Sequence, residues 1–130
     1  MENIKKSGIT NIDENVISQI LNYLEQFEKE QWFLNEDYTV EMLASKFKTN
    51  STYLSKIINQ IKGCSFTTYI NNLRIEFIIE KLENDKKFLL YSIQALSEIS
   101  GYNNVQTFTR AFTLHTKIKP SEYIKQLKNR

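Results

Sequence analysis

The 130-residue chain has few of the residues that interrupt helices or bind metals. It contains one proline and three glycines, too few for the frequent turns of a sheet protein. It also contains one cysteine and one histidine, which excludes an intrachain disulfide and a structural zinc site with four Cys or His ligands. A glycine-rich phosphate loop and a catalytic triad are missing as well. We expect no bound metal, no cofactor and no enzymatic activity.

Long apolar runs are also missing. No stretch approaches the roughly 20 apolar residues of a membrane span, and residues 1–10 lack the apolar core of a signal peptide. We therefore expect a soluble cytoplasmic protein without a membrane segment. Its 41% apolar composition suffices for one or two small cores, and the dominance of Leu, Ile, Lys, Glu, Asn and Gln predicts an all-α fold.

Charge is distributed unevenly along the chain. Residues 1–43 hold three lysines and nine acidic residues, a net charge of −6, whereas residues 44–130 hold 14 basic and six acidic residues, a net charge of +8. This asymmetry indicates that the later part faces a polyanion and that the earlier part has another role. The alternative is a set of solvated lysine side chains on helix surfaces.

The acidic part predicts one amphipathic helix over residues 13–29, because its apolar residues recur at spacings of three and four. Residues 31–37 follow as an apolar connector that we expect to pack onto the next unit. We assign residues 1–37 to this extra N-terminal helix with its connector, and residues 38–130 to the main domain.

The main domain contains the same pattern twice. In each copy, a capped short helix with apolar residues at i, i+3, i+4 and i+7 is followed by a tight turn and a second capped helix. The buried positions are Val40, Leu43, Ala44, Phe47, Leu54, Ile57 and Ile58 in the first copy, and Ile93, Leu96, Ser97, Ser100, Phe108, Ala111 and Phe112 in the second. The offset is 53 to 54 residues throughout. Chance rarely reproduces caps, spacing and turn together, so the chain is predicted to hold two helix-turn-helix lobes.

A long helix over residues 65–83 is predicted between the lobes, after Gly63 ends the preceding helix. Its predicted buried stripe is Phe66, Tyr69, Ile70, Leu73, Phe77, Ile78 and Leu82. Nineteen residues span roughly 28 Å at about 1.5 Å each, comparable to the about 34 Å of one DNA turn. The lobes then cover about residues 38–64 and 91–127, with residues 84–90 as a basic loop.

The second helix of each lobe carries a polar stripe without Asp or Glu. The stripes are Thr52, Ser55, Lys56 and Asn59 in the first lobe, and Gln106, Thr109, Arg110 and Thr113 in the second. Such side chains suit the major groove, where Asn or Gln pairs with adenine and Arg or Lys with guanine. The alternative is the ordinary polar face of an amphipathic helix, which the repetition of the pattern disfavours.

Helix starts supply candidates for phosphate contacts, because they present free N–H groups and the positive end of the helix dipole. The candidates are Thr39, Asn50, Ser51, Ser65, Ser92 and Asn104, together with the basic Lys117. Ordinary capping is the alternative for the helix starts. His115, by its place in the repeat, is predicted to lie on the inward side of its helix, as a packed or edge histidine.

These residues resemble the DNA-binding domain of AraC/XylS-type transcription regulators. The matching segments are YTVEMLASKFKTNSTYLSKIINQIKGCSFTTYINNLRI and SIQALSEISGYNNVQTFTRAFTLHTKIKPSEYI, within about two thirds of the chain. The resemblance implies two homeodomain-like three-helix lobes on a rigid linker helix that bind double-stranded DNA sequence-specifically. It places base contacts at Thr52, Ser55, Lys56, Gln106, Thr107, Thr109 and Arg110, and it matches Arg74 to the basic residue of the family's linker helix.

The chain departs from the family pattern at Lys117, where members usually have glycine, and at Lys119, where Thr or Ser is usual. Residues 1–37 lie outside the pattern and look similar to the connection in longer regulators, especially those of Bacteroidetes-type bacteria. We therefore expect a fragment whose sensor or dimerisation region is missing, with RNA polymerase as a further partner. The alternative function is a helical protein-interaction module that kept the fold and lost DNA affinity. Gln106 and Arg110 have long side chains with several hydrogen-bond donors, whereas the first stripe has few such donors. We therefore expect the second lobe to set specificity.

Overall fold

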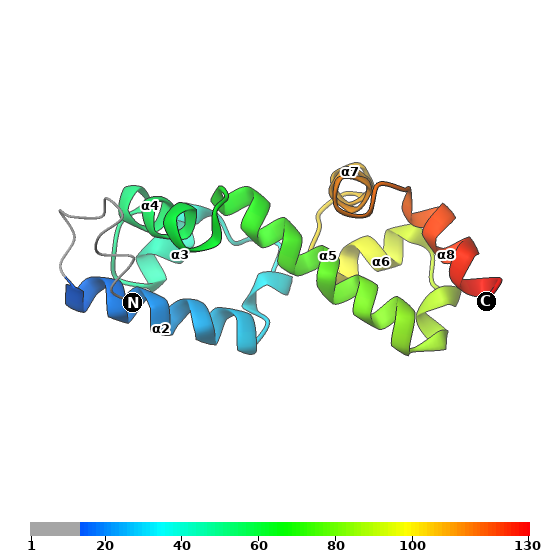
Figure 1. The fold of residues 1–130 in the computed structure, drawn as a ribbon, viewed down its shortest axis with the longest axis horizontal. Coiled ribbons are helices and arrows are strands. Elements are labelled where there is room, and N and C mark those ends of the chain that lie inside the picture. Colours follow the sequence, from blue (N-terminus) through cyan, green and yellow to red (C-terminus); the bar gives the residue numbers. More distant parts are fainter. Residues whose placement is uncertain (1–13) are drawn as a thin grey trace. The chain divides into compact units, whose positions relative to one another are not determined.

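The computed structural model describes residues 14–130, and this part of the chain is all-helical, as predicted. The elements are α2 (Glu14–Lys29), η1 (Trp32–Leu34), α3 (Val40–Lys46), α4 (Ser51–Lys62), α5 (Phe66–Asn84), η2 (Lys86–Leu90), α6 (Ile93–Ile99), α7 (Val105–Thr116) and α8 (Pro120–Lys128), where η denotes a 3-10 helix. Figure 1 labels the α-helices. No helix in the described range is long and apolar enough to cross a membrane. Asp13, the predicted start of the first helix, lies outside the described residues.

Two compact units make up the described chain. The first contains residues 14–32 and 37–70, and the second contains residues 33–36 and 71–130. Helix α5 belongs to both, because its residues up to Ile70 lie in the first unit and the others in the second. Each unit contains one of the two predicted helix-turn-helix pairs, α3 with α4 and α6 with α7.

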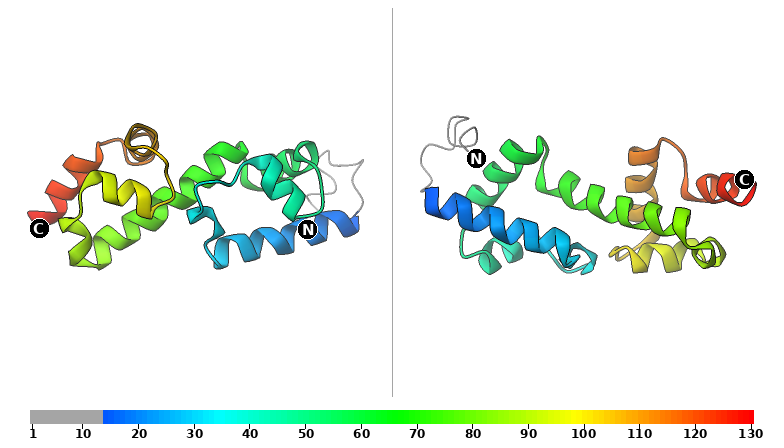
Figure 2. Two further views of the ribbon diagram at one scale, coloured as in Figure 1. Left: turned by 180° about the vertical axis from the view of Figure 1, so that it is seen from behind. Right: turned by 60° about the horizontal axis from the view of Figure 1, so that its bottom comes forward.

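Helix α2 supplies the first unit with a buried apolar face. Its Ile20 and Phe27 are fully buried. Tyr23 stacks on Phe47 with ring centroids 5.0 Å apart, and Phe27 lies 6.3 Å from the Tyr69 ring. Figure 2 shows from two sides how α2 runs along the α3–α4 pair. Of the predicted core positions in this unit, Leu43, Ala44, Phe47, Leu54, Ile57 and Ile58 are buried, whereas Val40 at the start of α3 is only half-buried.

The second unit is built around a row of aromatic rings. Tyr102 and Phe108 lie 5.7 Å apart, Phe108 and Phe112 also 5.7 Å, and Phe112 and Tyr123 5.3 Å. Around this row, the buried cluster contains Ile75, Ile78, Leu82, Leu96, Tyr102, Phe108, Phe112 and Ile124. The row joins α7 to α8, so the inward face of α7 is fixed by ring contacts on both sides.

The predicted buried stripe of α5 is partly wrong. Phe66, Leu73 and Phe77 are only half-buried, whereas Arg74 and Ile75 are buried. The reason is that α5 contributes to two cores, so the buried face is not one straight stripe along the helix. A single helical period cannot describe a helix whose two ends pack in different units.

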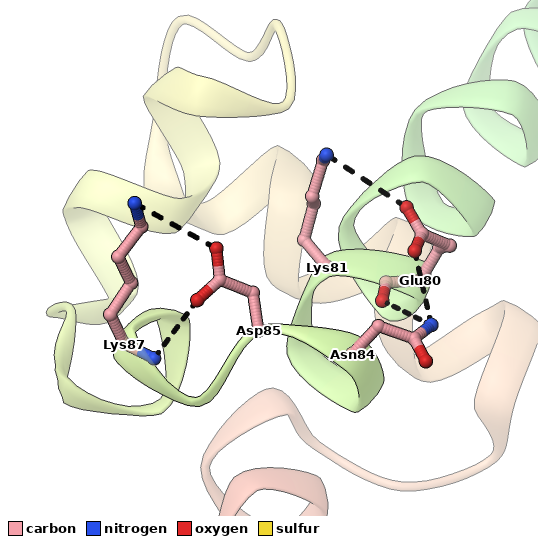
Figure 3. Close-up of polar contacts among 5 residues, drawn as sticks. All are labelled: Glu80, Lys81, Asn84, Asp85 and Lys87. Carbon is pink, nitrogen blue, oxygen red and sulfur yellow. Dashed lines mark hydrogen bonds and ion pairs between the residues drawn. The ribbon is translucent and has the colours of Figure 1, made fainter.

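The predicted basic loop after α5 is also wrong, because residues 86–90 form the 3-10 helix η2. Asp85 caps η2 by accepting a hydrogen bond from the Lys87 amide at 3.3 Å and forms an ion pair with its Nζ at 3.8 Å, as Figure 3 shows. At the end of α5, the Asn84 side chain donates to the carbonyl of Glu80 at 2.9 Å. Phe88 and Leu89 of η2 pack against the core of the second unit, which fixes the segment.

The two helix-turn-helix copies place left-handed residues at equivalent positions but use glycine differently. The turn after the first short helix has Lys48 (φ 60°) in one copy and Gly101 (φ 97°) in the other. The residue that ends the second helix is Gly63 (φ 71°) or Lys117 (φ 73°). Lys117 thus adopts the left-handed conformation that favours glycine, although it has a side chain. At this position the sequence departs from the family pattern, but the backbone has the same geometry as at Gly63.

Lys117→Gly should raise the free energy of unfolding by about 1 kcal/mol, because a left-handed conformation costs an L-residue roughly 1–2 kcal/mol and glycine nothing. Urea denaturation of the free protein measures the change. Lys117→Ala is the matched control, since it removes the same charge but keeps a Cβ at the left-handed φ of 73°, and it should bring no gain. Equal effects of the two substitutions would show that charge, not backbone strain, is responsible.

Candidate nucleic-acid interface

The sequence predicts that five of the helix-start residues, Thr39, Asn50, Ser65, Ser92 and Asn104, are helix caps, and all five are confirmed. Each side-chain oxygen accepts a hydrogen bond from the backbone N–H three residues later, at 3.1 Å for Thr39, 2.9 Å for Asn50, 3.2 Å for Ser65, 3.0 Å for Ser92 and 2.8 Å for Asn104. The caps therefore satisfy part of the donors that open each helix. The remaining N–H groups of the first turn stay available, and the roles of these residues in phosphate binding stay predictions.

Helix α7 presents the polar face with more long hydrogen-bond donors. Gln106, Thr107 and Arg110 are exposed, and Thr109 is half-buried. Within the described part of the chain, the side chains of Gln106 and Arg110 form no hydrogen bond or ion pair. The half-buried Thr113 instead donates its hydroxyl hydrogen to the carbonyl of Thr109 at 2.7 Å. Amide and guanidinium donors one helical turn apart thus point to solvent without a protein partner.

The inward side of α7 explains why this face is outward. Phe108 and Phe112 are fully buried and hold the helix in the aromatic row of the second unit. Residues on the other side of α7 form an open surface hollow lined by Val105, Gln106, Thr109, Arg110, Thr113, Leu114 and Lys117. Neither the sequence of α7 nor the lining of this hollow contains an acidic residue.

Helix α4 presents the equivalent face of the first unit. Thr52 and Lys56 are exposed, whereas Ser51 and Ser55 are half-buried. This helix also lacks acidic residues. Its second lysine, Lys62, is held by Glu28 at 3.1 Å, so Lys56 is the cation of α4 that remains without a described ion-pair partner.

A family model described as a helix-turn-helix domain matches residues 43–126, more than half of the chain. The chain belongs to the AraC-type helix-turn-helix family. The matched range contains α4, α6 and α7 whole and α3 from Leu43 onward.

Relatives and solved structures agree with this membership. The chain is 29% identical over 106 residues to the uncharacterised HTH-type transcriptional regulator YdiP of Escherichia coli K12, covering 75% of this chain and 32% of that protein. The C-terminal domain of AraT, a response regulator from Geobacillus stearothermophilus, matches with a TM-score of 0.71 and 25% identity over 83% of this chain and 84% of that one. The DNA-binding domain of AdpA, solved in complex with a target DNA, shares the fold with a TM-score of 0.72 at 15% identity, over 85% and 94% of the two chains. This AraC-type chain thus spans about a third of the length of its curated relative.

One residue of the outward face of α7 in this AraC-type chain, Leu114, was not predicted from the sequence. Leu114 is 72% exposed and lies four residues after Arg110, in the same surface hollow. Its spacing from Gln106 and Arg110 places it on the same side of the helix as the polar stripe, but Leu114 is apolar and so is not part of that stripe in sequence.

The predicted inward placement of His115 is wrong. The side chain is exposed, and its Nδ1 lies 3.4 Å from Oδ1 of Asn72 on α5. The repeat pairs His115 with Ile61, which is itself only half-buried. The core of each unit ends before this last turn of the second helix, so the repeat position does not guarantee burial.

Proposed function

We propose that this chain is the sequence-specific DNA-binding part of a transcription regulator and that α4 and α7 each enter a major groove. The observation that carries the proposal is the pair of acid-free, exposed polar faces in the same position of the duplicated motif. Helix-turn-helix proteins place this second helix in the major groove. The AraC-type membership of the chain supports the same function.

The two lobes have unequal roles in this proposal. In the second, Arg110 pairs with guanine and Gln106 with adenine, while Thr107 and Thr109 contact neighbouring bases or phosphates. In the first, the contact residues Thr52, Ser55 and Lys56 have one long donor among them. The second lobe therefore sets specificity, and the first contributes mainly position and affinity.

Phosphates are bound at the helix starts and at Lys117. The N–H groups around Thr39, Asn50, Ser51, Ser65, Ser92 and Asn104 face one or other DNA strand, with dipoles that favour negative charge. These contacts fix the register of the protein without reading sequence. Each phosphate neutralised by a basic side chain adds to the salt dependence of binding.

The whole regulator is longer than this chain in our proposal. Residues 38–130 are its DNA-binding domain, residues 1–37 connect it to a sensor or dimerisation region, and it works in the cytoplasm with RNA polymerase as a further partner. The small share of YdiP that is matched, 32% of its length, supports a longer chain. The Bacteroidetes-type origin stays a prediction.

DNA binding is tested by selecting bound duplexes from a random pool and titrating the best one at several salt concentrations. Affinity should fall with rising salt at a log–log slope of about −0.9 per phosphate neutralised, and the selected motif should contain two separated groups of bases. No binding to any duplex at low salt would refute the proposal. It would instead favour a protein-interaction module on the same fold.

Arg110→Ala should weaken binding to the selected duplex by about 1–3 kcal/mol and relax the preference at one base pair, since a bidentate guanine contact carries about this much discrimination. Competition binding against single-base variants of the duplex measures both effects.

Arg110→Lys is the matched variant, because it keeps the charge and loses the planar pair of donors. It should keep most of the affinity and lose most of the base preference. If Arg110→Ala weakens binding equally on every sequence, Arg110 contacts a phosphate and not a base. Lys56→Ala should have a smaller effect on base preference than Arg110→Ala; the reverse order would contradict the unequal roles of the lobes.

A further inference from the structure

A buried arginine of α5 binds the connector within the second unit. Arg74 is only 8% exposed. Its Nε donates to the carbonyl of Phe33 at 2.6 Å, and its Nη2 donates to the carbonyl of Asn35 at 2.9 Å. One side chain therefore forms two hydrogen bonds with the connector. In addition, the Phe33 ring makes an edge contact with the Phe77 ring, with ring centroids 6.5 Å apart.

The same guanidinium lies against the turn that precedes α7. Its central carbon is 5.2 Å from the centre of the Tyr102 ring, a distance typical of a cation–π contact. Gly101 lies so close that an added Cβ would be 2.9 Å from the carbonyl oxygen of Leu34 and 3.0 Å from Nε of Arg74. The connector, Arg74 and the turn thus touch one another directly.

Two further polar contacts fix the turn. The Tyr102 hydroxyl donates to Oδ1 of Asn71, one helical turn before Arg74, at 2.7 Å. With its amide nitrogen toward Glu36, the Asn103 side chain donates to both carboxylate oxygens of that residue at 3.0 Å. The turn is therefore bound by α5 on one side and by the connector on the other.

This turn determines where α7 starts. Tyr102 packs edge-on against Phe108, with ring centroids 5.7 Å apart. Asn104, two residues after Tyr102, caps the helix through the amide of Thr107. The contact candidates Gln106 and Arg110 follow within the first two turns, so a shift of the turn shifts them.

We propose that Arg74 is a positioning residue for DNA reading: it clamps the connector onto the turn before α7 and thereby sets the orientation of Gln106 and Arg110. The proposal rests on the proposed function for its DNA part. It makes the connector between α2 and α3, which lies outside the helix-turn-helix pairs, a determinant of base preference in the second lobe.

A purely stabilising role fits Arg74 less well. Taking a guanidinium out of water is costly, and apolar side chains of similar volume often stabilise a protein as well or better. Burial accordingly lowers the pKa of Arg74, while the proximity of Tyr102 and Glu36 opposes that shift. What the guanidinium provides and an apolar residue does not is a fixed fork that joins two carbonyls and a ring in one geometry.

Two substitutions of Arg74 test the clamp. Arg74→Lys keeps the charge but cannot hold both carbonyls with one planar group, and Arg74→Gln removes the charge. Ile78→Val, in the buried core one turn further along α5, is the control for a loss of stability without loss of the clamp. All variants are compared where urea denaturation shows them to be folded, so a general loss of stability is measured separately.

The first readout needs no DNA. Amide hydrogen exchange of residues 101–110, followed by mass spectrometry, should be about tenfold faster or more in Arg74→Gln than in Ile78→Val at matched stability. Without the clamp, the turn can open by itself, and its amides then exchange without unfolding of the whole unit. Arg74→Lys should lie between them. Equal exchange in Arg74→Gln and Ile78→Val would overturn the clamp.

The second readout is the base preference in the selected duplex. Arg74→Lys should lower the preference at the pair lost in Arg110→Ala by about fivefold or more, out of the roughly 5- to 150-fold that a bidentate contact carries, and leave the preference that depends on Lys56 unchanged. A uniform loss at all positions would overturn the positioning role. If no duplex binds the unsubstituted protein, the proposed function fails, while the exchange experiment still decides whether the clamp exists.

Discussion

Phe112→Ala should lower the free energy of unfolding by about 3–5 kcal/mol, the range found when a buried aromatic ring is truncated. The ring is fully buried and lies between Phe108 at 5.7 Å and Tyr123 at 5.3 Å. Its removal leaves a cavity in the middle of the aromatic row that joins α7 to α8. Because whole domains are stable by only about 5–15 kcal/mol, this is a large share of the total.

The same substitution should impair DNA binding without touching the reading face. Phe112 follows Arg110 by two residues, about 200° around the helix, so it lies on the opposite side of α7. Urea denaturation followed by circular dichroism gives the free energy, and titration of the selected duplex gives the affinity. Loss of affinity should track the loss of folded second unit.

Phe112→Leu is the matched control, since it keeps most of the volume and should cost less than about 1.5 kcal/mol. A cost below about 1 kcal/mol for Phe112→Ala would contradict a well-packed core at this position. Unchanged stability together with lost binding would place Phe112 at the interface, contrary to its burial.

The features that sequence predicted correctly are local ones. Caps such as Asn50 and Asn104 depend on one side chain and the next turn of backbone, and the apolar spacing of each short helix depends on the helical period alone. The duplication strengthened the prediction of two helix-turn-helix lobes, because the same caps, spacing and turn occur in both copies. The outward stripe with Gln106 and Arg110 followed from the same periodicity, so its exposure could be predicted as well.

The features that sequence missed depend on contacts between distant residues. The burial of Arg74 requires the carbonyls of Phe33 and Asn35, some 40 positions earlier. The residue spacing within α5 gives no indication of these contacts. The straight stripe predicted for α5 failed because two cores share the helix. Likewise, residues 86–90 look like a basic loop in sequence, whereas in the structure Asp85 caps η2 and Phe88 and Leu89 pack against the core of the second unit.

Gly101→Ala should lower the free energy of unfolding by about 2–5 kcal/mol, from two separate sources. The φ of 97° lies beyond the usual left-handed value near 57°, and an L-residue there is strained by about 1–2 kcal/mol. The new methyl group would also press on the Leu34 carbonyl at 2.9 Å and on Nε of Arg74 at 3.0 Å, and such overpacking costs typically about 1–3 kcal/mol. Urea denaturation of the free protein measures the sum.

Gly63→Ala separates the two sources. Gly63 is also left-handed, with φ 71°, but a Cβ added there meets nothing within 4 Å, so this variant should show the strain alone, about 1–2 kcal/mol. The excess cost at Gly101 then measures how tightly the connector is held against the turn. Arg74→Lys, combined with Gly101→Ala, should reduce that excess, because a clamp already loosened lets the Leu34 carbonyl move away. Equal costs at both glycines would show that the connector yields freely, and a connector that yields freely cannot orient α7.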